Sequence, residues 1–175
     1  MRIEIASYDP TWPEKAAREA ERWKTALGDA LIEVHHIGST SVPNLAAKPV
    51  LDLIPVIAEG VDLDSLQPAV HAMGYQWLGE NGLARRRYCR RSSPTTGARL
   101  VQAHIWTEGD SEIRRHLAFR DLLRADPLMM GAYETLKRHC ASHFRDNSEA
   151  YCNCKATWIA TAEAKALRAL EEDGT

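Results

Sequence analysis

The sequence predicts an α+β fold, in which a small mixed β-sheet is backed by an N-terminal helix and covered by a C-terminal helical bundle. An amphipathic helical pattern comes first, short runs rich in Val, Leu and Ile follow, and from Asp110 onward the pattern is helical. Elements in this order can bury one apolar core between a sheet and helical layers. At 175 residues the chain has the usual size of one domain, so we expect residues 1–175 to form a single unit.

The first element is predicted to be an extended arm or strand, and the second a helix. Residues 2–8 alternate apolar and polar side chains, which is the period of a strand. Thr11-x-x-Glu14 has capping-box spacing, and Pro13 suits a first helical turn. The helix should end near Gly28, with a core-facing stripe formed by Ala16, Ala20, Trp23 and Leu27.

Five segments are expected to pair as the sheet. Pro49–Ile57 is apolar apart from Asp52, which is typical of a central strand buried on both faces. Pro55 indicates that this strand is irregular or has left the sheet centre by that point. A helix closed by Gly74 is expected over residues 62–73. The five strand segments are residues 32–37, 49–57, 75–78, 86–90 and 99–106.

Three helices are predicted for the C-terminal part. Residues 126–127 and 145–147 carry the signals that stop one helix and start another. The expected helices are Ser111–Ala125, Pro127–Phe144 and Ser148–Glu172.

Composition narrows the class of protein. The 22 basic and 24 acidic residues nearly balance, so the overall charge argues against nucleic acid and a membrane as partners, and any attraction for phosphate must be local. No apolar run approaches the roughly 18 residues of a spanning helix. Four unevenly spaced cysteines do not suggest a secreted disulfide framework. We therefore expect a cytoplasmic protein with free thiols.

The segment His36–Asp52 carries the clearest chemical signal. Gly38 lets the backbone approach a ligand without a Cβ in the way. The N–H groups and hydroxyls of Ser39 and Thr40 can face a phosphate, although simple capping of the next turn is the alternative. Asp52 is a hard oxygen ligand for Mg²⁺, and a buried carboxylate is costly unless it is paired, hydrogen-bonded or metal-bound. These parts suit phosphoryl or nucleotidyl transfer.

This segment resembles the signature of the GrpB family, H-I-G-S-T-x-V-P-x-L-x-x-K-P-h-h-D, where h is apolar. The resemblance extends over almost the whole chain and implies a minimal nucleotidyltransferase-like fold. It also implies nucleotide binding, with a divalent metal: Mg²⁺ first, Mn²⁺ or another ion as the alternative. Lys48 belongs to the motif and is expected to bind phosphate as a point charge. Further matches are Tyr8-Asp9-Pro10-x-Trp12, Phe119-Arg120-Asp121-x-Leu123-Arg124-Ala125-x-Pro127, Tyr133-x-x-Leu136-Lys137 and Tyr151-x-x-x-Lys155.

The metal site needs a second member. A nucleotidyltransferase usually has two carboxylates two residues apart on one strand, because alternate side chains share a face. Here Ile54 occupies the second position. His104, which also matches the family pattern, is the candidate to complete the site as metal ligand or proton carrier; a hydrogen-bonded structural role is the alternative. His36 either contacts the ligand or orients the loop backbone.

Six arginines gather on the hairpin predicted between residues 85 and 99. Alternation places Arg87 on one face with Arg85 and Arg91, where it is expected to meet phosphate. Ion pairs on a solvated hairpin are the alternative, and RNA binding lacks interleaved aromatic residues beyond Tyr88. Arg120, on a predicted helix, is a further candidate for phosphate binding. The hairpin arginines are Arg85, Arg86, Arg87, Arg90, Arg91 and Arg99.

Two other patterns are better explained without a metal. Asp62-x-Asp64 follows a glycine and precedes a helix, where acidic side chains act as caps. Cys140-x-x-His143 with Cys152-x-Cys154 contains four zinc-ligand types, but Cys-x-Cys is an unusual zinc spacing.

Two functions follow from these observations. The first is metal-assisted transfer of a nucleotidyl group from a nucleoside triphosphate to an unknown acceptor, with Asp52 and His104 as catalytic residues and metal ligands. The alternative is a non-catalytic module that binds a nucleotide or another phosphorylated metabolite. GrpB-like domains are fused to dephospho-CoA kinase in some proteins, so the resemblance also points to coenzyme A metabolism.

Overall fold

A computed structural model describes residues 2–173 and shows a mixed five-stranded sheet with five α-helices. The strand order is β1-β2-β5-β4-β3, with β2 and β5 parallel and every other neighbouring pair antiparallel. The strands are β1 Leu31–Ile37, β2 Leu51–Ile57, β3 Gln76–Trp77, β4 Arg87–Ser92 and β5 Arg99–Thr107. The helices are α1 Trp12–Leu27, α2 Gln67–Ala72, α3 Ser111–Ala125, α4 Pro127–His143 and α5 Ser148–Asp173.

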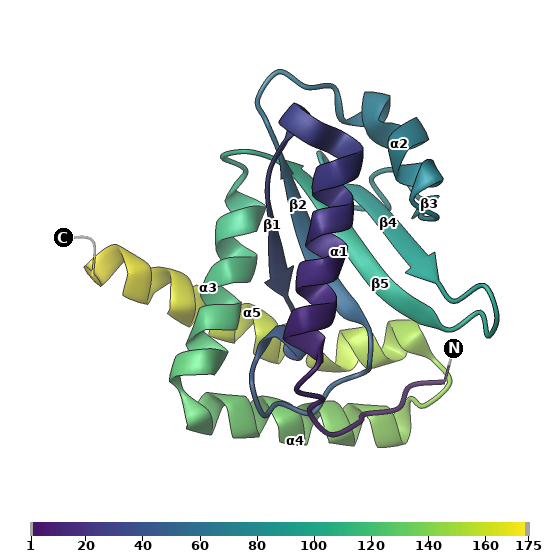
Figure 1. Cartoon of the computed structure of the whole chain (residues 1–175). Coiled ribbons are helices and arrows are strands. Elements are labelled where there is room, and N and C mark those ends of the chain that lie inside the picture. The colour runs from purple at the N-terminus through teal and green to yellow at the C-terminus, as the bar shows by residue number, and fades with distance from the viewer. Residues whose placement is uncertain (1, 174–175) are drawn as a thin grey trace.

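Two helices cover one face of the sheet and form its main core. Figure 1 shows α1 in front of the strands, with α2 beside it near β3 and β4. Trp12 and Trp23 of α1 and Val70 of α2 pack against Leu53 of β2 and Ala103 of β5. Since successive side chains of a strand point to opposite faces, the neighbouring residues of β2 and β5 are left for the other face.

That other face carries the polar residues. Ile54 and Trp106 are buried on it under Ile113 and Leu117 of α3. Asp52, two residues before Ile54, shares the same face at the start of the strand. The face is thus apolar where α3 covers it and polar where β2 begins.

The helical bundle packs against the loop that joins β1 to β2. Val42 and Leu45 of this loop are buried with Leu123 of α3 and Tyr133 of α4. Figure 1 shows α4 along the lower end of the sheet, close to this loop. The short 3₁₀ turn Ser39–Ser41 is therefore held between the sheet and the bundle.

The elements follow the predicted order, with local differences. The α1 capping box is absent: the Thr11 side chain accepts no hydrogen bond from the helix, and Thr11 N and Oγ1 instead donate to the Asp9 carboxylate at 2.8 and 2.6 Å. The helix expected over residues 62–73 is a 3₁₀ turn, Leu63–Leu66, followed by α2. Pro55 lies inside β2, opposite Val34 of β1, and the strand stays between β1 and β5.

The N-terminal residues form an extended arm with one isolated bridge. Ala6 exchanges two backbone hydrogen bonds of 2.9 Å with Ala47, and Ile3 N donates to Arg145 O at 2.7 Å. The arm thus connects the β1–β2 loop with the turn between α4 and α5. Within residues 2–173, no helix combines the length and the apolar character needed to cross a bilayer.

Candidate functional site

The loop after β1 requires glycine at position 38. Gly38 has φ of +69°, a conformation that side chains with a Cβ rarely adopt. A Cβ built there would lie 2.6 Å from Asp52 Oδ2. The backbone at Gly38, predicted to approach a ligand, lies against the Asp52 carboxylate in this structure.

Two arginines of α3 fix the backbone of this loop. Arg124 donates from Nε and Nη2 to Ser41 O at 3.0 and 2.7 Å. Arg120, predicted to bind phosphate, donates from Nη1 to His36 O at 3.2 Å and pairs with Asp121. Its guanidinium thus lies at the base of the loop and is occupied by protein groups.

His36 supports the loop from inside. Its Nε2 lies 2.9 Å from Thr40 Oγ1. Burial lowers the pKa of His36 to about 4, with Asp52 opposing this shift and Arg124 and Arg120 adding to it. The imidazole is therefore neutral at pH 7, and its observed contact is with the loop.

Asp52 is held by residues of the neighbouring strand. Gln102, its register partner on β5, donates from Nε2 to Asp52 Oδ1 at 2.9 Å. The side chain of Asp52 is 26% exposed, and His104 Nε2 lies 3.9 Å from Oδ1. Burial would raise the pKa of Asp52, but His104 first, then Gln102 and Lys48, outweigh it and hold that pKa below its usual value. Asp52 is therefore ionised at neutral pH, beside His104 as the sequence predicts.

The environment of His104 selects one tautomer. Arg86 Nη1 lies 3.3 Å from His104 Nδ1, and a guanidinium can only donate. Nδ1 is then the acceptor, and Nε2 carries the hydrogen that faces Asp52. In this tautomer Nε2 has no lone pair for a metal, so ligation through Nε2 would require Nδ1 to take the proton and Arg86 to turn away.

Lysines of the loop and of α5 supply positive charge. Lys48 Nζ and Lys155 Nζ lie 5.2 and 4.1 Å from the centroid of the same ring, Tyr151. The pKa of Lys155 is lowered mainly by burial and then by Lys48, while Asp52 acts in the opposite direction. Within the described residues, no carboxylate forms an ion pair with either ammonium at 4 Å or less. Two like charges therefore lie over the same ring, and Cys152 and then Asp52 act against the lowering of the Lys155 pKa.

Other groups of α4 line the same region. Lys137 is fully buried and donates from Nζ to Ala46 O of the loop. Burial and then Lys155 lower its pKa to about 7. Burial raises the pKa of Tyr133, and the hydroxyl of Ser39 partly offsets this rise. Lys137 thus holds the loop in place, while Ser39 lies next to Tyr133.

The structure explains why a second carboxylate is absent from β2. Ile54 has no exposed surface and packs with Ile37, Val56 and Trp106. A carboxylate there would lie in an apolar cluster without a partner, which is costly. Among the described residues no three His, Cys, Asp or Glu side chains form a metal-binding group.

Arg87 lies away from the other candidates. It pairs with Ile105 of β5, so its side chain points to the face opposite His104. There its Nε and Nη2 bond both oxygens of Asp64 at 2.6 and 2.7 Å. The structure does not bring Arg87 to Asp52, because the strand pleat separates them.

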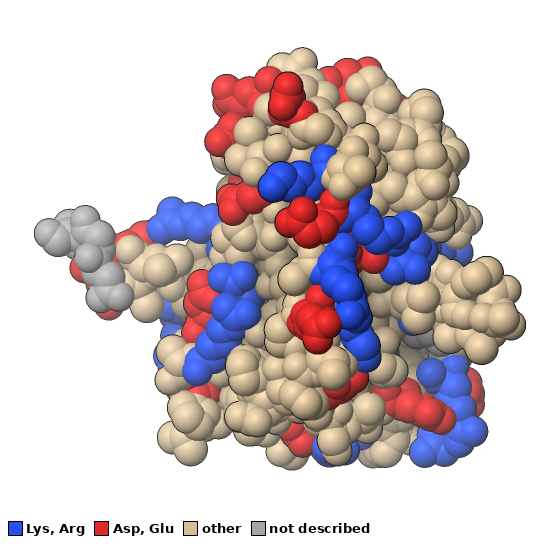
Figure 2. Space-filling model, in the orientation of Figure 1, with Lys and Arg blue, Asp and Glu red and all other residues tan. Residues whose placement is uncertain are grey.

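Charges on the α1 side of the sheet are largely paired. Figure 2 shows blue and red side chains interleaved on this face. Arg91 and Arg22 both bind the buried Glu19 at 2.7 Å, and Lys15 binds Asp9 at 2.9 Å. A groove of about 550 Å³ lies among these residues. Arg87 and Arg91 thus form ion pairs, which was the alternative to phosphate binding for the arginine hairpin.

Asp62 is a cap, as its position indicates. Its side chain accepts from Asp64 N at 3.0 Å at the start of the 3₁₀ turn.

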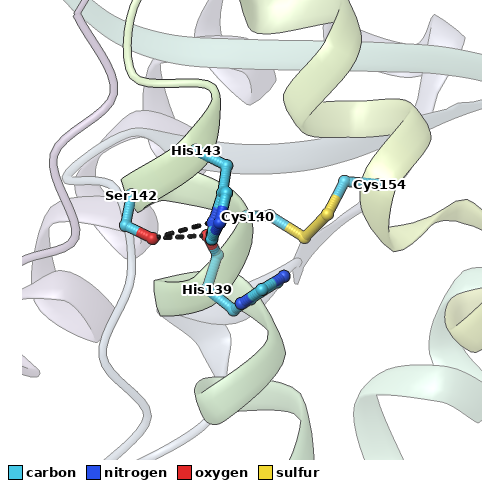
Figure 3. The surroundings of a disulfide bond; sticks show 5 residues. All are labelled: His139, Cys140, Ser142, His143 and Cys154. Atoms are coloured by element: carbon cyan, nitrogen blue, oxygen red, sulfur yellow. Dashed lines mark hydrogen bonds between the residues drawn. A yellow bond between two sulfur atoms is a disulfide. The ribbon is translucent and has the colours of Figure 1, made fainter.

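The prediction of four free thiols is wrong for two of them. Cys140 and Cys154 form a disulfide, whereas Cys89 and Cys152 are free. Figure 3 shows this disulfide joining two helices. Two of the four zinc-ligand types noted in the sequence, Cys140 and Cys154, are therefore bonded to each other and not available to a metal.

Several contacting residues were not identified from sequence as members of the site. Gln102 alternates with His104 on β5, so this spacing could have identified it. Arg86 belongs to the arginine hairpin, but its pairing with His104 depends on a turn in which Arg85 has φ of +68°. Lys155 lies 103 residues beyond Asp52 in the numbering, and no local pattern links the two.

The chain resembles known proteins in sequence over most of its length. The family model described as "GrpB protein" matches residues 2–165. The UPF0157 protein YqkA of Bacillus subtilis is 38% identical over 95% of this chain, which spans 48% of that relative, about half its length. A protein named dephospho-CoA kinase from Mycolicibacterium paratuberculosis is 28% identical over 94% of this chain and 46% of its own length.

Two solved structures resemble the chain in fold. The conserved protein GrpB from Enterococcus faecalis superposes with a TM-score of 0.87 at 39% identity, over 95% of this chain and 99% of that one. The Cid1 poly(U) polymerase superposes with a TM-score of 0.51 at 16% identity, over 86% of this chain and 49% of that one. The second likeness shows a nucleotidyltransferase-like fold and no more. By its sequence and its fold, the chain belongs to the GrpB family.

Proposed function

We propose that this site binds a nucleoside triphosphate with a divalent metal and transfers its nucleotidyl group to an acceptor. The observation that carries the proposal is the meeting of Asp52 with two ammonium groups, Lys48 and Lys155, at a glycine-containing loop. Two partly exposed like charges with one neighbouring carboxylate leave positive charge that a phosphate would neutralise. Ser39 and Thr40 supply further donors in the loop.

The residues fit a magnesium ion better than a transition metal. Mg²⁺ is usually bound by one or two carboxylates together with substrate phosphates and water. Asp52 meets this requirement, since Gln102 occupies Oδ1 and the other oxygen faces Gly38. When bound, the ion would neutralise charge on the triphosphate. Mn²⁺ could take the same oxygen ligands.

The chain's own residues would position the reacting groups. Lys48 and Lys155 would hold the terminal phosphates, and Ser39 would orient the phosphate next to the loop. A hydroxyl or amine of the acceptor would attack the α-phosphate, the bond between the α-phosphate and the bridging oxygen would break, and pyrophosphate would leave. His104, fixed by Arg86, would keep Asp52 oriented through its N–H.

A second function is favoured by Ile54. Because this position lies in the apolar cluster, the site lacks a pair of carboxylates on β2. A module that binds a nucleotide or other phosphorylated metabolite without transfer needs no such pair. The relative named dephospho-CoA kinase makes a coenzyme A precursor one candidate ligand. For either function we propose a cytoplasmic protein that acts on small phosphorylated molecules and not on nucleic acid.

Calorimetric titration tests the binding. Inorganic pyrophosphate and ATP, each with and without Mg²⁺, should bind the wild-type protein. Lys155→Gln should weaken pyrophosphate binding about tenfold, the equivalent of one charge-assisted hydrogen bond of about 1.4 kcal/mol. Lys165→Gln is the matched control, because Lys165 is on the same helix but pairs with Asp126 at 3.7 Å. Equal losses in both variants would refute this site.

Turnover separates the two functions. A screen of hydroxyl and amine acceptors with ATP and Mg²⁺ should release pyrophosphate if the protein transfers a nucleotidyl group. Binding at the Lys155 site without pyrophosphate release across the screen would favour the binding module.

A further inference from the structure

The disulfide joins α4, which carries Lys137, to α5, which carries Lys155. Cys140 lies on α4 and Cys154 on α5, which are connected by the four residues Phe144–Asn147. Figure 3 shows the bond bridging these helices. The two cysteines are 14 residues apart in sequence. The bond therefore closes the helical hairpin close to its turn.

The same helical turns carry the residues that contact the loop. Lys137 precedes Cys140 by three residues, and Tyr151 precedes Cys154 by three, so each pair shares a helix face. Lys155 directly follows Cys154. The bond thus lies between the Lys137 contact with the loop and the Tyr151 ring under Lys48 and Lys155.

Without the bond, little apolar packing would hold the hairpin at this point. The cluster around the disulfide has only four buried members among the described residues, Ile3, Cys140, Ala141 and Tyr151, with Ile5, Leu136 and Cys154 partly buried against them. Ile3 belongs to the N-terminal arm. Small clusters close to a turn have low local stability, so they open more readily than a central core.

The two sulfur atoms differ in access. Cys140 is fully buried, whereas Cys154 is partly exposed, so a reagent would meet the sulfur of Cys154 first. Cys152 is an exposed free thiol, but residues two apart on a helix point about 200° apart. Cys152 is therefore poorly placed to attack Cys154 within the intact helix. Reductants keep an exposed thiol such as Cys152 in its free form. The same reductants make a nearby disulfide reversible.

We propose that Cys140 and Cys154 form a reversible redox lock, which holds the α4–α5 hairpin against the phosphate-binding loop when oxidised. The co-reactant is a dithiol reductant. Its thiolate attacks Cys154 Sγ, the bond to Cys140 breaks, and Cys140 leaves as a thiolate that takes up a proton. The second thiol of the reductant then releases Cys154 as a thiol and closes its own disulfide. Two electrons and two protons pass to the protein, and a small-molecule disulfide reverses the reaction.

The lock itself can be tested without any ligand. Wild-type protein is prepared oxidised with glutathione disulfide and reduced with dithiothreitol, and mass spectrometry locates the bond. Amide hydrogen exchange over residues 140–155 should be at least tenfold faster after reduction. Cys154→Ser should exchange as the reduced protein does under both conditions. Cys152→Ser is the matched control, and its exchange should follow the redox state as in the wild type.

Pyrophosphate binding tests whether the lock affects the proposed site, and this part of the experiment rests on the proposed function. The dissociation constant should rise about tenfold on reduction in the wild type and in Cys152→Ser, but not change in Cys154→Ser. If neither redox state binds pyrophosphate, the proposed function fails, and hydrogen exchange alone decides the lock. Equal exchange in the oxidised and reduced wild type, or a bond found only between Cys152 and another cysteine, would overturn the proposal.

Discussion

Replacement of Gly38 by alanine tests the contact between the loop and the carboxylate. Two separate effects are expected. Alanine would have to adopt φ of +69°, and its Cβ would lie 2.6 Å from Asp52 Oδ2 and 3.1 Å from Asp52 Cβ. The first effect is common to many glycines, whereas the second exists because the loop closes over Asp52.

The magnitude follows from these two effects. With φ of +69° and ψ of −173°, Gly38 lies in a region essentially reserved for glycine, where another residue costs about 1–3 kcal/mol. Displacement of the Asp52 carboxylate would also break its bond from Gln102 Nε2, at 2.9 Å, and a hydrogen bond to a charged group is worth about 1.5–3 kcal/mol. Gly38→Ala should therefore destabilise the protein by about 3–6 kcal/mol.

Gly60→Ala is the matched control. Gly60 has φ of +80°, and a Cβ there would meet no atom within 4 Å, so only the backbone cost of about 1–2 kcal/mol applies. Urea unfolding of both variants and the wild type measures the difference. Gly38→Ala should lose at least 1 kcal/mol more than Gly60→Ala, an order-of-magnitude threshold based on the hydrogen-bond energy. Equal losses would refute the reasoning that the loop closes against Asp52.

Three further predictions concern neighbouring residues. Asp52→Asn should abolish the Mg²⁺ dependence of ATP binding in calorimetry with little change in thermal unfolding; the reverse result would make Asp52 a structural residue. The pKa of His36 is lowered from 6.5 to about 4, so between these values the unfolded chain binds a proton that the folded chain excludes. Stability should therefore fall as the pH falls from about 6.5 towards 4, and His36→Gln should reduce this dependence in urea unfolding; an unchanged profile would contradict the burial argument. Arg124→Met should destabilise the protein by about 1 kcal/mol, since it removes two partly exposed hydrogen bonds to Ser41 O, whereas Arg114→Met on the same helix should be nearly neutral.

Local patterns predicted most of the fold. The strand around Asp52 and the helix Ser111–Ala125 follow from apolar periodicity and stop signals, which act over a few residues. The α1 capping box was wrong because the Thr11 hydroxyl donates to the Asp9 carboxylate and therefore accepts no hydrogen bond from the first turn. Pro55 was expected to make its strand irregular or to take it out of the sheet centre; β2 stays between β1 and β5, while its pairs with β5 skip Ile54 and Pro55.

The site was predicted in part, for a similar reason. Gln102 and His104 alternate along β5 and share the face that carries Asp52, so His104 lies beside Asp52 as expected. The position of Arg87 depended on which face of β4 lies on the side of the sheet that carries Asp52, and the register of Arg87 with Ile105 of β5 decides this. Lys155 required the packing of α5 against the loop, which is a long-range contact.

The disulfide could not be predicted from spacing alone. Four cysteines allow several pairings, and the composition favoured free thiols. The pairing of Cys140 with Cys154 depends on two helices that turn back on each other after His143. Sequence separation does not indicate which faces of the two helices meet.

A crystal structure with Mn²⁺ and a non-hydrolysable ATP analogue tests the central claim most directly, because Mn²⁺ takes the same oxygen ligands as Mg²⁺ and has anomalous scattering. We expect an anomalous peak bound to Asp52 Oδ2, with phosphate oxygens in contact with Ser39, Lys48 and Lys155. Density for the analogue elsewhere on the protein, with Asp52 still bonded to Gln102 and without a metal, would contradict it.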